Sequence, residues 1–168
     1  MGGILYRYLS GDHDRLDELL QRTVATPGVV DMQSYGGFRK GLLRHIAMEE
    51  KIVVPEIARL QGGRQPAVAE RIHLDHGALV ALLVPPPSAS IVATIRSILQ
   101  VHNALEEREG GLYQLLEQLV GPGADTVLKT LTSLPEVPVL PHNERPEVIE
   151  ATRRAVARAG YEFKTMPE

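Results

Sequence analysis

The sequence repeats one short pattern, HIAMEE starting at His45 and HNALEE starting at His102. Each copy places a glutamate, Glu49 or Glu106, four residues after the histidine. On an α-helix this spacing stacks the two side chains on one face, about 6 Å apart along the axis. The repeat therefore predicts two helices that each direct an imidazole and a carboxylate toward the same interior.

Long amphipathic segments contain and surround these two copies. Caps, apolar periodicity and Gly or Pro stops predict helices over 10–25 or 12–25, 32–60, 66–84 and 88–121. Pro55 should kink the second helix or tighten its last turns, and Gly110-Gly111 should bend the fourth. Because short connections make sequential helices antiparallel, the predicted fold is all-α, an antiparallel up-down-up-down four-helix bundle.

The chain continues beyond the fourth helix. A short helix is expected over 125–131, a Pro-rich extended stretch over 134–146 and one further helix over 146–159. We therefore divide the chain into a bundle over 1–122 and a C-terminal extension over 123–168. The apolar residues of the last helix predict that the extension packs on the bundle or on a partner subunit.

Two lone histidines, His13 and His76, lie on the apolar faces of the first and third predicted helices. With the two repeats they make four imidazoles and two carboxylates that face one interior, which are costly to bury without a partner. A pair of metal ions would satisfy all six groups. The alternative is that all four histidines are structural, each with its own hydrogen-bond partner.

Four further side chains lie near the predicted ligands. Glu50 and Glu107 are rotated about 140° from their histidines, so we interpret them as surface residues or hydrogen-bond acceptors for a ligand. His73 lies one turn before His76 and could be a fifth ligand, a hydrogen-bonding neighbour of a ligand or an exposed side chain; we favour the interpretation that it is not a ligand. Tyr113 is expected either to hydrogen-bond in the pocket or to be a core residue.

Composition excludes several classes of function. The net charge of −3 over 168 residues gives no basic field for nucleic acid, and no apolar run is long enough to span a membrane. The absence of a signal-like apolar region at the start makes the cytoplasm the expected location. Because the chain has no cysteine, any metal must be held by nitrogen and oxygen ligands.

Imidazole and carboxylate donors suit Fe, Zn, Mn or Cu. Two bridging carboxylates with two histidines per metal leave open coordination positions, which fits a pair of iron ions that bind a diatomic ligand. A histidine-rich donor set carries less negative charge than a glutamate-rich one. We therefore expect reversible binding or redox cycling rather than powerful oxidation.

From Leu9 to Leu119 the chain resembles hemerythrin-like proteins with a histidine–histidine–glutamate cation-binding domain. The resemblance rests on the ordered set Asp12-His13, His45-x-x-x-Glu49-Glu50 followed by Pro55, His76, and His102-x-x-x-Glu106-Glu107 followed by Tyr113. It implies a non-haem di-iron centre with an oxo or hydroxo bridge, although Zn, Mn or another divalent metal can occupy such a site. It further implies that His13 and His102 hold one iron, His45 and His76 the other, and Glu49 and Glu106 bridge them.

The resemblance implies binding of O2, NO or peroxide, or sensing of iron or redox state. Oxygen-carrying members have a fifth histidine where this chain has Val80, and an aspartate one residue beyond the position of Glu106. These departures argue against an oxygen-carrier site. The alternatives are a di-iron NO or peroxide reductase, an iron donor for iron–sulfur repair, and a helical module that forms a homodimer through residues 146–159.

Overall fold

The computed structural model describes residues 2–167 and contains helices and connecting segments, with no strand among those residues. The elements, in chain order, are α1 (Ile4–Thr23), α2 (Met32–Met48), the π-helical turn η1 (Glu49–Val53), α3 (Val54–Leu60), α4 (Ala69–Leu82), α5 (Ala89–Glu107), α6 (Leu112–Val120), the 3-10 turn η2 (Gly121–Gly123), α7 (Ala124–Ser133) and α8 (Pro146–Arg158). The all-α class predicted from the sequence is confirmed.

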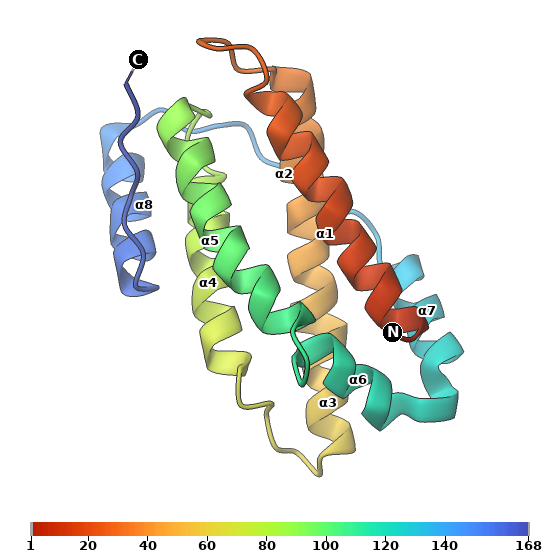
Figure 1. Ribbon diagram of the computed structural model, residues 1–168. Helices are drawn as coiled ribbons and strands as arrows, with labels where there is room; N and C mark the ends of the chain where they lie inside the picture. Colours follow the sequence, from red (N-terminus) through yellow and green to blue (C-terminus); the bar gives the residue numbers. More distant parts are fainter. Residues whose placement is uncertain (1, 168) are drawn as a thin grey trace.

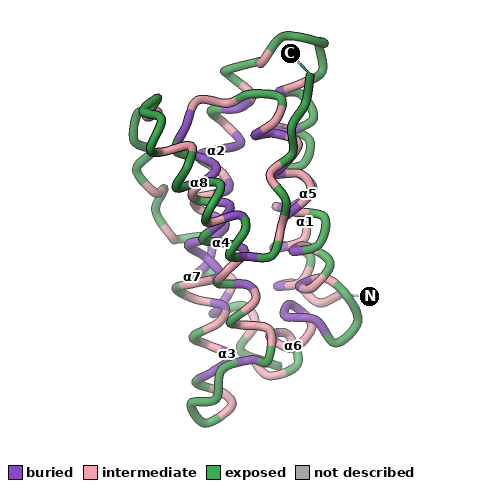
Figure 2. Tube along the Cα trace, turned by 90° about the vertical axis from the view of Figure 1, so that its left-hand side faces the viewer, coloured by how far each residue is buried: buried purple, intermediate pink, exposed green. Residues whose placement is uncertain are grey.

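The long helices α1, α2, α4 and α5 lie side by side along the length of the molecule (Figure 1). The buried parts of the chain follow the sides of these helices that face one another (Figure 2). The helices α6 and α7 lie near the N-terminus, and α8 packs on the outer side of α4. Among the described residues, no helix is both long enough and apolar enough to cross a membrane.

The first helix begins at Ile4, earlier than the expected start at Ser10 or Asp12. Its first turn is capped from elsewhere in the chain, because Glu117 Oε2 accepts hydrogen bonds from the backbone N–H groups of Leu5 (2.9 Å) and Tyr6 (3.0 Å). A carboxylate at this position satisfies N–H groups that would otherwise lack partners. The extra turns bury Leu5 and add it to the core.

The second helical segment runs without interruption from Met32 to Leu60, as predicted, but its geometry changes before Pro55. Residues 49–53 form a π-helical turn, so the helix widens there rather than tightens. Proline has no N–H to donate, and its ring collides with the carbonyl one turn earlier; a wider turn relieves both problems. This turn begins at Glu49, one of the two buried glutamates.

The fourth predicted helix is divided into two, α5 and α6. Arg108 leaves the helical conformation, and Gly110 adopts a positive φ of 72°, which favours glycine. At Gly111 an added Cβ would lie 2.6 Å from the carbonyl oxygen of Glu106, so a larger residue does not fit without a shift. The break between 107 and 112 lets α6 take its own position relative to α5.

Two apolar clusters form the core. One contains Leu16, Leu20, Phe38, Leu79 and Ile95 together with other residues of α1, α2, α4 and α5. The other contains Leu5, Leu9, Ile57, Leu112 and Leu116 together with neighbours. The predicted polar ligands belong to neither cluster, and along α1 His13 falls between Leu9 of one and Leu16 of the other.

The C-terminal segment contributes to both clusters. Val156 and Ala159 belong to the first cluster, and Val127 and Leu131 belong to the second. The Thr152 hydroxyl donates to the carbonyl oxygen of Ala81 at 3.1 Å. The helices expected over 125–131 and 146–159 are present as α7 and α8, whereas the division into separate units at residue 122 stays a prediction.

Candidate metal centre

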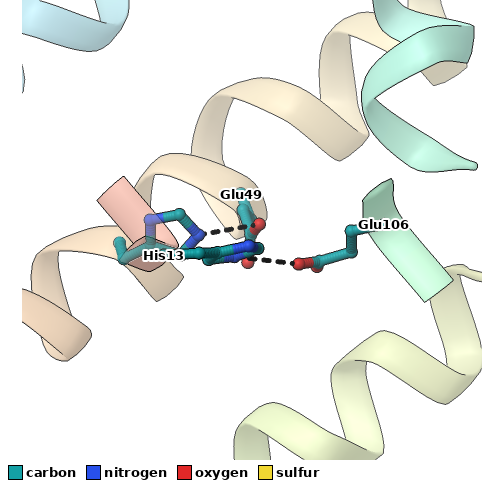
Figure 3. Close-up of side chains that lie close together, drawn as sticks. His13, Glu49 and Glu106 are labelled. Carbon is teal, nitrogen blue, oxygen red and sulfur yellow. Dashed lines mark hydrogen bonds and ion pairs between the residues drawn. The ribbon is translucent and has the colours of Figure 1, made fainter. Parts of the chain in front are cut away.

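Four imidazoles and two carboxylates meet in the interior of the helices. The histidines are between 2% and 5% exposed and the glutamates are 0% exposed. The contributing residues are His13 of α1, His45 of α2, Glu49 at the start of η1, His76 of α4, and His102 and Glu106 of α5. In Figure 3, His13, Glu49 and Glu106 point toward one another from three different helical segments.

Each imidazole uses its Nδ1 atom to contact an acidic side chain. The partner always comes from another helical segment, so each contact spans the gap between two helices. The distances are 2.5 Å from His13 to Glu107, 2.8 Å from His45 to Asp12, 2.6 Å from His76 to Glu50 and 3.2 Å from His102 to Asp75.

These four contacts form a closed ring. They connect α5 to α1, α1 to α2, η1 to α4 and α4 to α5. An acid on Nδ1 holds the proton there, which fixes the ring orientation and leaves Nε2 free to act as a ligand. We call Asp12, Glu50, Asp75 and Glu107 the carboxylate ring.

The opposite nitrogen of each imidazole faces a buried glutamate. Glu49 lies 3.1 Å from His45 Nε2 through Oε1 and 2.9 Å from His76 Nε2 through Oε2. Glu106 lies 3.3 Å from His13 Nε2 through Oε2 and 3.2 Å from His102 Nε2 through Oε1. Each glutamate therefore divides its two oxygens between two histidines.

These atoms form two clusters with metal-ligand spacing. One contains His13, His45, Glu49 and Glu106, and the other contains Glu49, His76, His102 and Glu106. Within each cluster the donor atoms lie within 4.8 Å of one another. Both glutamates belong to both clusters, as bridging ligands would.

This grouping corrects the pairing that the resemblance implied. His13 lies beside His45, with ring centroids 4.5 Å apart, and His76 lies beside His102 at 4.8 Å. The two histidines of each implied pair face the same glutamate but belong to different clusters. His13 and His102 both face Glu106, and His45 and His76 both face Glu49. Helices adjacent in the chain are neighbours here, so each half of the sequence supplies the imidazoles of one cluster.

The electrostatics of the site favour a cation. Burial lowers the pKa of His45, but the Glu49 carboxylate and the hydrogen bond to Asp12 outweigh it and raise that pKa to about 10. Burial likewise lowers the pKa of His102, but Glu106 and Asp75 raise it to about 10. The imidazoles hold on to protons because the buried carboxylates need positive charge nearby, and a metal ion would supply that charge.

One buried oxygen also fits a cation site. Glu106 Oε1 is buried and lies 3.2 Å from His102 Nε2, but it accepts no hydrogen bond within the part of the chain that the structure describes. A buried carboxylate oxygen without a hydrogen bond is costly. Nitrogen and oxygen donors of this kind suit first-row transition metals, so the residues present fit a metal site.

Tyr113 of α6 reaches the centre of the first cluster. Its hydroxyl lies 2.9 Å from His13 Nε2, 3.1 Å from His45 Nε2, 2.5 Å from Glu49 Oε1 and 3.1 Å from Glu106 Oε2. Burial and the two carboxylates raise the pKa of Tyr113 well above its usual value. The Tyr113 hydroxyl thus forms hydrogen bonds within the site, and Tyr113 is also a fully buried core residue.

The other expected neighbours also have clear positions. Glu50 and Glu107 accept hydrogen bonds from the Nδ1 atoms of His76 and His13, and neither glutamate belongs to either cluster. The side chain of His73 is 79% exposed and lies outside both clusters, with its Nδ1 3.2 Å from Glu50. The assignment of metal ligands stays a prediction.

Sequence reasoning missed the roles of Asp12 and Asp75. Each aspartate immediately precedes a lone histidine, in Asp12-His13 and Asp75-His76. Neither aspartate contacts the histidine that follows it. Asp12 contacts His45 and Asp75 contacts His102, the histidine of the next long helix in each case. The repeated Asp-His dipeptide was a signal that could have revealed both residues.

A cavity of about 460 Å³ leads to the site between α1 and α5, with α2 as its floor. Its lining includes His13, His45 and His102. Exposed or half-exposed side chains of α1 and α5, such as Asp17 and Arg96, also line it. The cavity therefore gives small molecules a route to the imidazoles.

Comparisons with known proteins agree with this site. Residues 4–116 match the family model described as the hemerythrin HHE cation binding domain. The matched range contains all six residues of the two clusters and Tyr113. No curated protein and no solved structure matched the chain.

Proposed function

Because the chain belongs to the hemerythrin HHE cation-binding family, we propose that it is a non-haem protein that holds two iron ions. His13 and His45 would hold one ion, and His76 and His102 the other. Glu49 and Glu106 would bridge the two ions. The observation that carries this proposal is the pair of buried four-residue clusters that share both glutamates.

The proposal is supported by the surroundings of the ligands. Every imidazole has its Nδ1 against an acid of the carboxylate ring, an arrangement typical of metal-binding histidines. Structural histidines would need hydrogen-bond partners, but they would not need to point Nε2 atoms at two common glutamates. The carboxylate ring also accounts for why this centre can be assembled from four separate helices.

We also propose the bundle topology that holds these ligands. In it the long segments α1, α2 with α3, α4, and α5 alternate in direction as an antiparallel four-helix bundle. Short connections favour this arrangement, because chain neighbours then pack side by side. The proximity of α1 to α2 and of α4 to α5 supports it.

The ligand that we propose is a small molecule such as O2, NO or peroxide. When bound, iron would supply open coordination positions and a reversible change of oxidation state. The protein's own residues would position the ions, flank the site with two apolar clusters, and admit ligands through the cavity beside His13 and His102. Four neutral imidazoles against two carboxylates limit the negative charge at the site, which favours binding and sensing over strong oxidation.

Substitution of the bridging glutamates tests this proposal. The wild-type chain should take up two irons on anaerobic reconstitution, whereas the double variant Glu49→Ala/Glu106→Ala should take up almost none, measured by mass spectrometry of the metal. Glu18→Ala, at an exposed position of α1, is the matched control and should load like the wild type. Full iron retention in a double variant whose helical content is unchanged would contradict the proposal.

A further inference from the structure

We propose that Tyr113 is a further metal ligand, bound through its phenolic oxygen at the position surrounded by His13 and His45. This inference rests on the proposed metal centre and adds a donor of a different chemical type. The ligand set that the resemblance implied contains only histidines and glutamates. The evidence is the position of the Tyr113 hydroxyl, the number of hydrogen bonds that a phenol can donate and the turn that brings the side chain there.

The hydroxyl of Tyr113 contacts every member of one cluster. Its four neighbours belong to His13, His45, Glu49 and Glu106, at distances from 2.5 to 3.1 Å. It therefore lies on the same inner side of the histidines as the two glutamates. No hydrogen bond connects it to His76 or His102 among the described residues.

Once the imidazoles have lost their Nε2 protons to make room for a metal, a phenol that keeps its own proton can satisfy only one of these four neighbours. When the imidazoles are neutral, as metal binding requires, and their Nδ1 protons face Glu107 and Asp12, both Nε2 atoms are acceptors. The two carboxylates are acceptors as well. A phenol has a single proton and can donate to one of the four, whereas a cation among them is attracted to all four and to the phenolic oxygen.

The break between α5 and α6 is what brings Tyr113 to the cluster. In an unbroken helix, Tyr113 would lie about 10 Å along the axis from Glu106. With the turn at Gly110-Gly111 between them, the two side chains meet, and the Tyr113 hydroxyl lies 3.1 Å from Glu106 Oε2. Because Gly111 approaches the Glu106 carbonyl too closely for a Cβ, this turn is specified by the sequence.

The ring of Tyr113 is also held from behind. Tyr6 packs against it edge-on with ring centroids 6.2 Å apart, and the Tyr6 hydroxyl donates to the carbonyl oxygen of Glu107 at 2.8 Å. A side chain that is fully buried and packed in this way cannot swing out of the cluster. The phenolic oxygen is therefore positioned before any metal binds.

Ligation by Tyr113 would make the two metal positions unequal. The His13–His45 position would have five protein donors, and the His76–His102 position would have four. On binding, the phenolic O–H bond breaks, the oxygen keeps the electron pair for the metal, and the proton leaves to solvent. A small ligand should then prefer the position with fewer donors, which the cavity reaches at His102, although the cavity also borders His13 and His45.

Spectroscopy of the iron-loaded full chain tests this inference. The protein is loaded with ferrous iron, oxidised to the ferric state with ferricyanide, and examined by visible absorption and resonance Raman spectroscopy. We expect a phenolate-to-iron(III) charge-transfer band with enhanced tyrosinate ring modes in the wild type. Tyr113→Phe should lose both signals while it keeps its iron, because the six other ligands remain.

The matched control is Tyr35→Phe, which alters another fully buried tyrosine, one whose ring packs against Phe38 and His142, and it should keep both signals. Iron-loaded wild type without tyrosinate modes, or an unchanged band in Tyr113→Phe, would overturn the inference and leave the proposed centre intact. Failure of the wild type to bind iron at all would instead remove the proposed centre and this inference together. The wild-type spectrum decides the matter even if Tyr113→Phe does not fold.

Discussion

At the scale of single residues, each candidate histidine has two different neighbours. Its outer nitrogen contacts an acid of the carboxylate ring, and its inner nitrogen faces Glu49 or Glu106. The outer contact fixes the tautomer and orientation of the ring, and the inner contact marks where a metal would bind. Removal of an outer acid should therefore weaken metal binding without removing a ligand.

Asp12 offers the cleanest test of this role, because it contacts His45 Nδ1 from a half-buried position on α1. We expect Asp12→Asn to weaken metal affinity by about 10- to 100-fold, the range typical for acids that orient metal-bound histidines. Competition against a chelator of known affinity measures the loss. Asp14→Asn, at an exposed neighbouring position, should leave the affinity unchanged, and equal affinities for the two variants would contradict the role of the carboxylate ring.

The sequence was sufficient to place the six candidate ligands together, because helical periodicity fixes which face of a helix a residue occupies. It was not sufficient to pair them. The pairing of His13 with His45 depends on the contact between α1 and α2, and periodicity says nothing of which helices touch. Asp12 was missed for the same reason, since its partner lies on another helix.

At the scale of elements, the breaks in the helices shape the site. The π-helical turn begins at Glu49, and the turn between α5 and α6 folds Tyr113 back toward Glu106. Pro55 and the pair Gly110-Gly111 marked both places in the sequence. The sequence therefore indicated where the helices change, but not which geometry they adopt there, because a proline can produce a kink, a tighter turn or a wider turn.

Gly111 should be intolerant of substitution. An added Cβ would lie 2.6 Å from the Glu106 carbonyl oxygen and 2.8 Å from those of Leu105 and Arg108, so Gly111→Ala must displace the backbone of the turn. We expect it to lower the free energy of unfolding by about 1–3 kcal/mol, measured by urea denaturation.

The matched control is Gly77→Ala in α4, where a Cβ would meet nothing within 4 Å. Replacing a glycine inside a helix with alanine removes an entropic cost, so this variant should gain about 0.5–1 kcal/mol. Comparable stability changes for the two variants would show that the turn at Gly111 is not tightly constrained.

At the scale of the whole molecule, the core consists of two apolar clusters and a polar group of ligands that belongs to neither.

The start of α1 shows why some contacts between distant parts of the chain could not be predicted from the sequence. Its first N–H groups are capped by Glu117, which no local pattern near Ile4 reveals. The polar layer contains buried carboxylates that need positive charge, so its stability should depend on metal.

Metal removal should therefore destabilise the protein. A metal that binds only the folded state adds about 2.7 kcal/mol at a free concentration one hundred times its dissociation constant. For a chain of this size that corresponds to a rise of roughly 5–10 °C in the midpoint of thermal unfolding. Calorimetry of the loaded and metal-free protein measures the difference, and identical midpoints would speak against a metal site in the folded core.

The central claim is that these helices hold two metal ions bridged by Glu49 and Glu106. The measurement that tests it most directly is an anaerobic titration of the metal-free protein with ferrous iron, with bound iron counted per chain. The account predicts saturation at two irons per chain. No uptake would contradict it and would make the four histidines and the two glutamates a structural hydrogen-bond network.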